Sequence, residues 1–182
     1  MKIVYIDCYY GFNSAMLLSA LLDAGAQEED ILSKARQSME DFDMQITETK
    51  ANSMDCKMVR TFGEQNPSEL GAISALEALD ADCVICSPVY LGDASDGEVI
   101  SALEKSGIET LPSSDISYSM SLGDAEFLIH LCAESGPLPD MDIISVGYGT
   151  AEGEADSLVT VYVGEYNGQN NIFAKEEQLI TV

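Results

Sequence analysis

The stretch CVICSPVYLGDASDGEVISALEKSGIETLP, residues 83–112, decides the fold class. Its first part, residues 83–91, is a continuous apolar run, which predicts a buried strand. A loop of small residues, 92–97, leads into a helix that Asp96 is expected to cap, and a short strand follows at 108–111. A strand, a helix and a second strand in this order form a βαβ unit, which predicts a parallel strand pair with a right-handed crossover.

The part of the chain before this unit alternates between the two kinds of periodicity, 3.6 residues for helices and two for strands. Asn66 and Glu69 flank Pro67 in a pattern typical of a helix start, with Asn66 as the cap and Glu69 reaching back to it. The predicted elements are a strand at 2–6, a loop at 7–14, helices at 15–24 and 27–39, a β-hairpin at 42–62 and a helix at 66–79.

The part after the unit predicts a further helix and an antiparallel pair of strands. These elements are a helix at 121–134, strands at 143–146 and 158–163 joined by a glycine-containing acidic loop at 147–156, a turn at 167–171 and a strand or tail at 172–182. The chain is therefore predicted to form one α/β domain, residues 1–166, with a C-terminal strand or tail, residues 167–182. Its sheet is expected to be mixed, with a βαβ unit and antiparallel hairpins.

Composition narrows the classes of function. The 182 residues include 32 Asp and Glu but only eight Lys and Arg, which gives a formal net charge of −24. Such a molecule is repelled by nucleic acid and by anionic membrane surfaces, so neither is expected as a partner. The sequence shows no signal peptide and no apolar run of about 18 residues. The five cysteines are therefore expected to be free thiols, and the expected location is the cytoplasm.

Three blocks of sequence occur along the chain in an order that is typical of a known protein family. They are IDCYYGFNSAMLLSALLDAG at 6–25, ALEAL at 75–79 followed by CSPVYLG at 86–92, and ISVGYGTA at 144–151 followed by a strand. In this order they resemble the nickel insertion proteins that complete the pincer cofactor of lactate racemase. The resemblance covers most of the chain.

The resemblance implies a class of ligand. Proteins of that family place nickel into a thiocarboxylated pyridinium mononucleotide, using CTP and a divalent metal. It therefore implies a nucleotide-like small molecule as the ligand here, with nickel or another divalent metal and CTP as cofactors.

The chain also departs from the family pattern. The aspartate of the family's Gly-Asp-Met is Ala15, the His-Glu-Val-Gly block before residue 69 is missing, and Met120 to Gly123 stand where Thr-Pro-Thr-Gly is expected. The His-Gly and Pro-Val-Pro-Ala block after Gly92 is missing as well. We therefore expect the scaffold without full nickel-inserting activity, assign no catalytic residue and leave the metal ligands unknown.

The first candidate ligand-binding residues follow the first strand. Asp7 and Cys8 stand at its predicted carboxyl end, where open α/β sheets bind ligands, and Gly11 belongs to the same family motif. Asp7 could supply a hard metal ligand and Cys8 a soft one. The alternative is that Asp7 caps the following turn and Cys8 packs in the core.

Two glycine loops supply the remaining candidates. Gly92 and Asp93 open one loop, and Gly147 and Gly149 open the other, so that backbone amides could hold a phosphate. Neither loop contains Lys or Arg and neither has the pattern of a P-loop. Ordinary turns are the alternative and are favoured for both loops, more strongly for the loop with Gly147 and Gly149.

Two other features are interpreted as structural. His130, the only histidine, lies beside the apolar stripe of its helix and is expected on the surface near Glu126 and Glu134. Cys83 and Cys86 belong to a predicted strand, where residues three apart point to opposite faces, so the two thiols are not expected to meet.

The function predicted for the chain is a nickel insertion protein-like domain that binds a nucleotide-like ligand or a divalent metal. The alternative is a non-catalytic module that forms homo-oligomers or binds a partner chain. An enzyme of unrelated chemistry on the same scaffold is the third interpretation.

Overall fold

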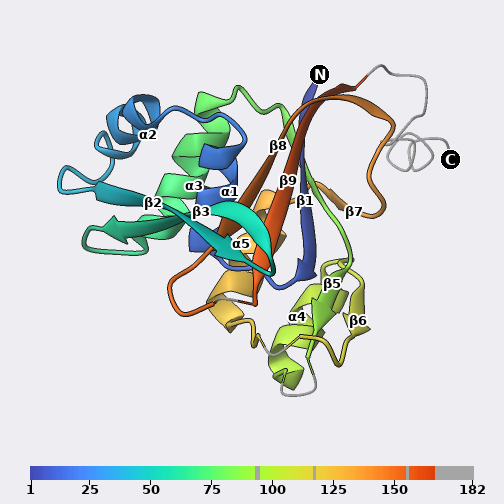
Figure 1. Ribbon diagram of the computed structural model, residues 1–182. Helices are drawn as coiled ribbons and strands as arrows, with labels where there is room; N and C mark the ends of the chain where they lie inside the picture. The colour runs from blue at the N-terminus through green and yellow to red at the C-terminus, as the bar shows by residue number, and fades with distance from the viewer. Residues whose placement is uncertain (93–94, 117, 155, 167–182) are drawn as a thin grey trace, which may run out of the picture.

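The computed structural model describes residues 1–92, 95–116, 118–154 and 156–166 (Figure 1). The helices are α1 (Ser14–Asp23), α2 (Glu28–Ala35), α3 (Pro67–Ala78), α4 (Gly97–Lys105) and α5 (Leu122–Leu131). The strands are β1 (Lys2–Tyr10), β2 (Asp43–Ala51), β3 (Met54–Phe62), β4 (Cys83–Cys86), β5 (Val89–Leu91), β6 (Thr110–Pro112), β7 (Glu134–Ser135), β8 (Met141–Thr150) and β9 (Leu158–Tyr166).

Seven strands form a mixed sheet in the order β2-β3-β8-β9-β1-β4-β7. The pairs β2–β3, β8–β9 and β1–β9 are antiparallel, whereas β1–β4, β4–β7 and β3–β8 are parallel. The strands β5 and β6 form a separate parallel pair joined by α4. The predicted α/β class, the mixed sheet, the βαβ unit and the two hairpins are therefore confirmed.

The strand predicted at 83–91 is divided into two strands that belong to different sheets. Ser87 and Pro88 separate them, because Pro88 has no N–H for the ladder of β4. The Ser87 amide still donates to Ile6 O of β1 (2.8 Å), and the Val89 amide donates instead to Glu109 O (2.8 Å). The chain thus leaves the main sheet at Ser87, and the βαβ unit lies beyond the end of that sheet (Figure 1).

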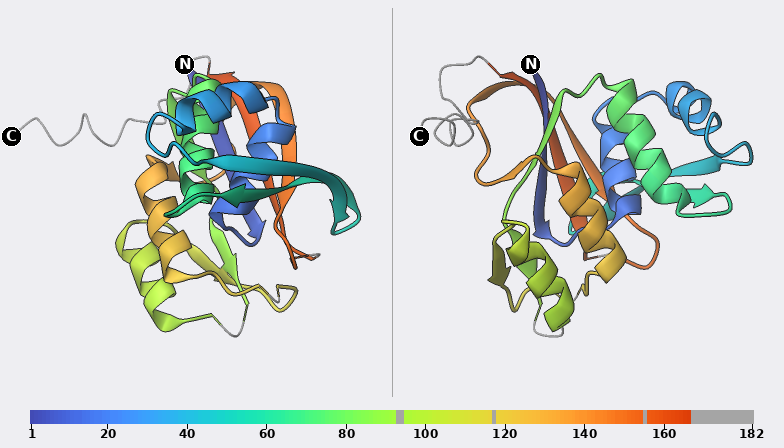
Figure 2. Two further views of the ribbon diagram at one scale, coloured as in Figure 1. Left: turned by 90° about the vertical axis from the view of Figure 1, so that its left-hand side faces the viewer. Right: turned by 180° about the vertical axis from the view of Figure 1, so that it is seen from behind.

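Helices α1, α3 and α5 lie on one face of the main sheet (Figure 2). The first of these packs on β8, β9 and β3, and α3 packs on α1. The main core lies between these layers and includes fully buried Phe12, Leu18 and Phe42. On the opposite face a second apolar cluster gathers around Ile3, Tyr5 and Ile85.

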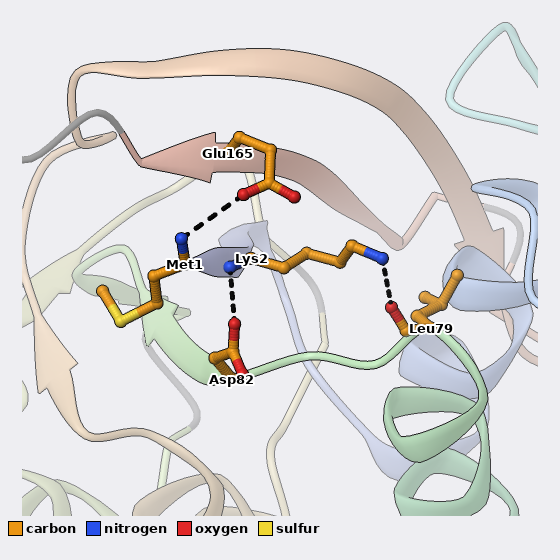
Figure 3. A network of polar contacts seen from close by, with 5 residues as sticks. All are labelled: Met1, Lys2, Leu79, Asp82 and Glu165. Atoms are coloured by element: carbon orange, nitrogen blue, oxygen red, sulfur yellow. Dashed lines mark hydrogen bonds and ion pairs between the residues drawn. The ribbon is translucent and has the colours of Figure 1, made fainter.

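Polar contacts hold the start of β1 in the sheet (Figure 3). The Lys2 amide donates to Asp82 (2.8 Å), and the Lys2 ammonium donates to Leu79 O at the end of α3 (2.8 Å). The terminal amine of Met1 lies 3.4 Å from Glu165 of β9. These contacts tie β1 to both of its neighbours in the sheet.

Several predicted boundaries are wrong. Residues 7–10 extend β1 instead of forming a loop, and β8 runs to Thr150, so the second glycine loop begins only at residue 151. Asn66 precedes α3 in the left-handed conformation (φ 44°) and makes no side-chain cap, so the predicted capping box is absent there. The predicted turn at 167–171 and strand or tail at 172–182 lie outside the described residues.

Candidate functional site

A cavity of about 530 Å³ lies at the end of β1, on the sheet face opposite α1. It is lined by Asp7, Tyr9, Tyr10, Asn52, Met54, Tyr148, Leu158 and Thr160. These residues come from β1, β3, β8, β9 and the β2–β3 turn. Pairing across the sheet brings them together, since Asp7 faces Thr160, Tyr148 faces Thr160, and Tyr10 faces Leu158.

The strand β1 is irregular where it borders the cavity. Its register with β9 shifts between Asp7 and Tyr10, as in a β-bulge. The Asp7 carboxylate accepts a hydrogen bond from the Tyr9 amide through Oδ1 (2.9 Å) and stabilises this irregular segment. As a result Tyr9 and Tyr10, although adjacent in sequence, both line the cavity.

Tyrosine rings give the cavity its chemical character. The Tyr9 ring contacts the Tyr10 ring edge-on, with centroids 4.6 Å apart, and lies 4.4 Å from the ring of Tyr90 in β5. Tyr10 and Tyr148 both pack against the apolar cluster around Leu158. Planar ligands stack favourably on such rings, and cations are attracted to their faces.

Asp7 and Cys8 lie on opposite faces of the sheet. Whereas Asp7 borders the cavity, Cys8 is fully buried in the core under the helices, where its amide donates to the Ser87 hydroxyl (2.8 Å). Burial raises the pKa of the Cys8 thiol, and the nearby Cys86 and Asp7 raise it further. Cys8 is therefore held as a neutral thiol, the form least suited to bind a metal.

Gly11 and Gly92 pack closely against Tyr118 and Ile116, and neither glycine borders the cavity beside Asp7. A Cβ at Gly11 would lie 2.8 Å from the Tyr118 ring, and one at Gly92 would collide with the Ile116 carbonyl. Tyr118 in turn donates to Phe12 O (3.0 Å). Close packing therefore accounts for glycine at both positions.

Gly92 also lies in a different, smaller cavity. This cavity has a volume of about 240 Å³ and lies at the carboxyl ends of β5 and β6. The structure thus does not bring Gly92 to Asp7. Asp93, predicted beside Gly92, lies outside the described residues.

Gly147 and Gly149 lie within β8 and contact α1. A Cβ at Gly147 would collide with the Ala20 carbonyl, and one at Gly149 would collide with the Met16 carbonyl and the Ala20 amide. Only glycine allows the helix and the strand to approach so closely. The intervening Tyr148 points the other way and borders the cavity, while its amide donates to Asp23 Oδ2 (2.9 Å).

The remaining structural interpretations are confirmed. His130 is exposed, and its Nδ1 lies 2.6 Å from the Glu126 carbonyl oxygen. Cys83 packs in the cluster around Tyr5 and Cys86 in the main core, so their thiols lie on opposite faces. All five cysteines are free.

Neither a cluster of metal-binding side chains nor a membrane-spanning helix is present in the described ranges. Within these ranges, no group of three or more His, Cys, Asp or Glu side chains is arranged to hold a metal ion. Nor does any helix in the part of the chain that the structure describes have the length and apolarity needed to span a membrane.

Three of the four departures from the predicted family pattern lie at the amino-terminal ends of the helices α1, α3 and α5. The Ser14 amide at the start of α1 donates to Asp124 Oδ1 in the first turn of α5 (3.1 Å), where Ser121 is the cap. Burial raises the pKa of Glu69 in the first turn of α3, and the nearby Asp124 raises it further. The segments expected to carry the missing motifs thus lie together, with carboxylates and hydroxyls in their place.

Sequence reasoning found one cavity residue, Asp7, and missed the others. Tyr9 and Tyr10 are neighbours in the sequence block at 6–25 that carries the resemblance, so two adjacent tyrosines beside Asp7 could have indicated an aromatic site. Asn52, Tyr148 and Thr160 come from three other elements, and only strand register brings them together.

The fold and the cavity define an α/β protein with helices on one sheet face and an aromatic, acidic cavity on the other. Residues 4–70 match the model of the family described as nickel insertion protein. The match confirms the predicted resemblance over β1 through the first turn of α3. No match was found among curated proteins or among solved structures.

Proposed function

We propose that the chain is a ligand-binding relative of the nickel insertion proteins, and that a nucleotide-like small molecule occupies the cavity beside Asp7. The observation that carries this proposal is the 530 Å³ cavity in which one carboxylate faces several tyrosines. Its volume falls within the range of small-molecule sites, which is about 300–1,000 Å³.

Each part of the cavity has a role in such a complex. The rings of Tyr9, Tyr10 and Tyr148 offer stacking surface to a planar base or pyridinium ring. One oxygen of Asp7 is held by the Tyr9 amide, which orients the other for a ligand hydroxyl, amine or cation. The side chains of Asn52 and Thr160 add a donor and an acceptor each.

Charge defines how a phosphate would be bound. No Lys or Arg lines the cavity among the described residues, so a divalent cation bound with the nucleotide would balance the phosphate charge. We propose that nickel or another divalent metal reaches the site with the ligand, with Asp7 as its protein contact.

We further propose binding without full nickel insertion. Ala15 stands where the family carries an aspartate, and the segment before Glu69 lacks the family's histidine block. The Asp124 carboxylate accepts a hydrogen bond from the Ser14 amide, next to Ala15, and contributes to the raised pKa of Glu69. The chain would then act as a carrier, a regulator or a partner of another chain.

The proposal is tested by calorimetric titration of the purified protein with CTP plus magnesium, and separately with nickel. Asp7→Asn keeps the size of the side chain and removes its charge, and Tyr148→Ala removes one ring. Glu40→Gln is the matched control, because Glu40 lines a separate acidic cavity.

We expect saturable binding that Asp7→Asn and Tyr148→Ala each weaken about tenfold or more, the effect of losing about 1.4 kcal/mol. Glu40→Gln should leave the affinity unchanged. Absence of binding at millimolar ligand, or equal affinity in all four proteins, would overturn the proposal.

A second candidate, a module that binds another copy of itself, is favoured by an exposed apolar edge. Ile143 and Ile144 of β8 are 48% and 60% exposed. Among the described residues β8 pairs with β3 only at Gly149 and Thr150, so the edge beside these isoleucines is unpaired. Antiparallel pairing of two β8 edges centred on Ile144 would continue the sheet without opposing like charges.

Light scattering coupled to gel filtration distinguishes this candidate from the first. A dimer that Ile144→Lys converts to a monomer supports it, with Leu138→Lys as a control at another exposed apolar site. A monomer at all concentrations rejects it and leaves the ligand-binding proposal unaffected.

A further inference from the structure

The end of the β2–β3 hairpin borders the cavity beside Asp7. Figure 1 shows this end passing in front of β9, and the left view of Figure 2 shows it projecting past β8 and β9 on the side away from α1. Asn52 of the turn and Met54, the first residue of β3, supply part of the cavity lining. The hairpin therefore covers the cavity on one side.

The pairing of its strands makes the hairpin a single unit with a narrow attachment. The two strands pair without interruption up to Ala51 and Met54, which flank the turn. Among the described residues, β3 pairs with β8 only through Lys57 and Met58. Nearer the turn, no hydrogen bond or ion pair in the described ranges joins residues 49–56 to another element. We call this segment, 49–56, the flap.

An ion pair lies where the flap begins. The Lys57 ammonium lies 3.8 Å from Asp23 Oδ1 at the end of α1, and 3.5 Å from Glu48 Oε1 on β2. Asp23 accepts with its other oxygen from the amide of Tyr148, which borders the cavity. The side chains of Lys57 and Asp23 are only 25% and 26% exposed, so salt screens their attraction less than that of a surface pair. The pair thus fixes the hairpin to α1 at the base of the flap.

The flap itself is held down by a small apolar cluster. Ala51 and Cys56 pack with Leu158, and Tyr10 and Tyr148 lie against this cluster. Ala51 is 2% exposed and Cys56 is 4% exposed, so both side chains are buried while the flap lies over the cavity. Segments with few buried contacts open locally at free energies well below that of global unfolding.

We propose that the flap opens and closes over the cavity independently of the rest of the fold, and that the Lys57–Asp23 pair favours the closed form. In the open form a ligand enters between the flap and the tyrosines, and in the closed form Asn52 and Met54 cover it. The opening follows from the way the hairpin is attached, whereas its use for ligand entry rests on the proposed function.

Cys56 allows the opening to be measured without a ligand. The reduced full-length protein is treated with excess iodoacetamide at constant pH, and alkylation of each cysteine is followed by mass spectrometry. We expect Cys56 to react faster than the fully buried Cys8, at a rate that changes little with urea below the unfolding transition. Alkylation of Cys8 requires global unfolding, so its rate should rise steeply with urea.

Lys57→Met removes the ammonium group and keeps the aliphatic stem. It should speed the alkylation of Cys56 about two- to fivefold, the effect of losing one partly exposed ion pair, and leave Cys8 unaffected. Lys50→Met is the matched control, because Lys50 pairs with Asp55 inside the flap (2.8 Å). Its Cys56 should react at the wild-type rate. Circular dichroism verifies the folding of both variants.

CTP with magnesium tests whether the flap controls access to the cavity. At about ten times its dissociation constant, a ligand bound beneath the closed flap should slow the alkylation of Cys56 about tenfold. If CTP does not bind, the proposed function fails, while the rates of Cys56 and Cys8 in the free protein still decide whether the flap opens.

Three results would overturn the inference. They are alkylation of Cys56 with the same urea dependence as Cys8, equal Cys56 rates in Lys57→Met and Lys50→Met, and saturable CTP binding that leaves the Cys56 rate unchanged. The comparison of Cys56 with Cys8 in the wild-type protein decides the question even if a variant does not fold.

Discussion

Ser19 joins α1 to the sheet through a single hydroxyl group. Its Oγ donates to Ala15 O (2.7 Å) and accepts from the Val59 amide of β3 (2.9 Å), and the side chain is fully buried. The Val59 amide has its partner only because a short polar side chain stands at this point of an otherwise apolar helix face. The Ser19 hydroxyl oxygen thus connects α1 directly to β3.

Ser19→Ala should destabilise the protein by about 1–3 kcal/mol, because it leaves the Val59 amide buried without an acceptor. Urea unfolding followed by circular dichroism measures the change. Ser106→Ala is the matched control, since the exposed Ser106 makes the same kind of bond to the carbonyl four residues back, to Ala102 O. A loss at Ser19 no larger than at Ser106 would show that the contact to Val59 contributes nothing.

At the scale of elements, the turn of the β2–β3 hairpin has a strained backbone. Both residues of its turn, Asn52 and Ser53, have positive φ angles, 48° and 64°. Turns of this kind favour glycine at the second position, and serine there carries a strain of about 1 kcal/mol. Asn52 also borders the cavity, so this turn shapes the proposed site.

Ser53→Gly should therefore stabilise the protein by about 0.5–1 kcal/mol, measured as a rise in Tm and in the urea midpoint. Ser114→Gly serves as the control, because Ser114 is exposed and does not have a positive φ. Glycine there should be neutral or slightly destabilising. Equal effects of the two changes would contradict the assignment of strain to the turn.

The amino-terminal end of α3 should make stability depend on pH. Burial and Asp124 raise the pKa of Glu69 above its ordinary value of 4.5. Because the pKa of Glu69 is higher in the folded state, the protonated form of Glu69 favours folding. This contribution to stability is complete below pH 4.5 and is lost as the pH rises through the pKa of the folded state. Because Glu69 is partly exposed, the effect is modest.

Glu69→Gln cannot ionise, so it should gain stability relative to the wild type as pH rises from about 4 to 7. Unfolding free energies of both proteins across this range provide the measurement. Glu77→Gln, at an exposed position on the same helix, is the matched control. A stability difference between Glu69→Gln and the wild type that stays constant with pH would contradict the interpretation.

For the whole molecule, the distribution of charge is the dominant feature. The net charge is −24, and five of the eight Lys and Arg residues lie between residues 34 and 60. Arg36, Lys50, Lys57 and Arg60 all form ion pairs there, one of them between Arg60 and Glu152. Most of these pairs are exposed and contribute little, so repulsion among the remaining carboxylates should govern how stability responds to salt.

Raising the ionic strength from about 10 to 150 mM shortens the screening length from about 30 to 8 Å and should raise the Tm. Glu64→Lys should raise the Tm at low salt and reduce its salt dependence. Choline chloride in place of sodium chloride tests for specific cation binding. A Tm that falls with salt would show that the few ion pairs outweigh the repulsion.

Local pattern predicted most of the elements, while pairing between distant strands determined most of the site. The apolar run at 83–91 predicted strand structure, but only the missing N–H of Pro88 shows where the chain changes sheets. Gly147 and Gly149 suggested a loop, because the close approach of α1 that requires them is a tertiary contact. Asp7 was identified from its place near the end of a strand, whereas its cavity neighbours depend on the β1–β9 register.

Because β1 is irregular, the insertion or deletion of a residue there during evolution would change which side chains line the cavity. Regular alternation would send Tyr9 and Tyr10 to opposite faces, but the register shift lets both rings border the same space. Loss of one residue between Asp7 and Gly11 would restore alternation and withdraw a ring without replacing any tyrosine. Chain length at this point, as much as residue identity, therefore sets what the cavity presents to a ligand.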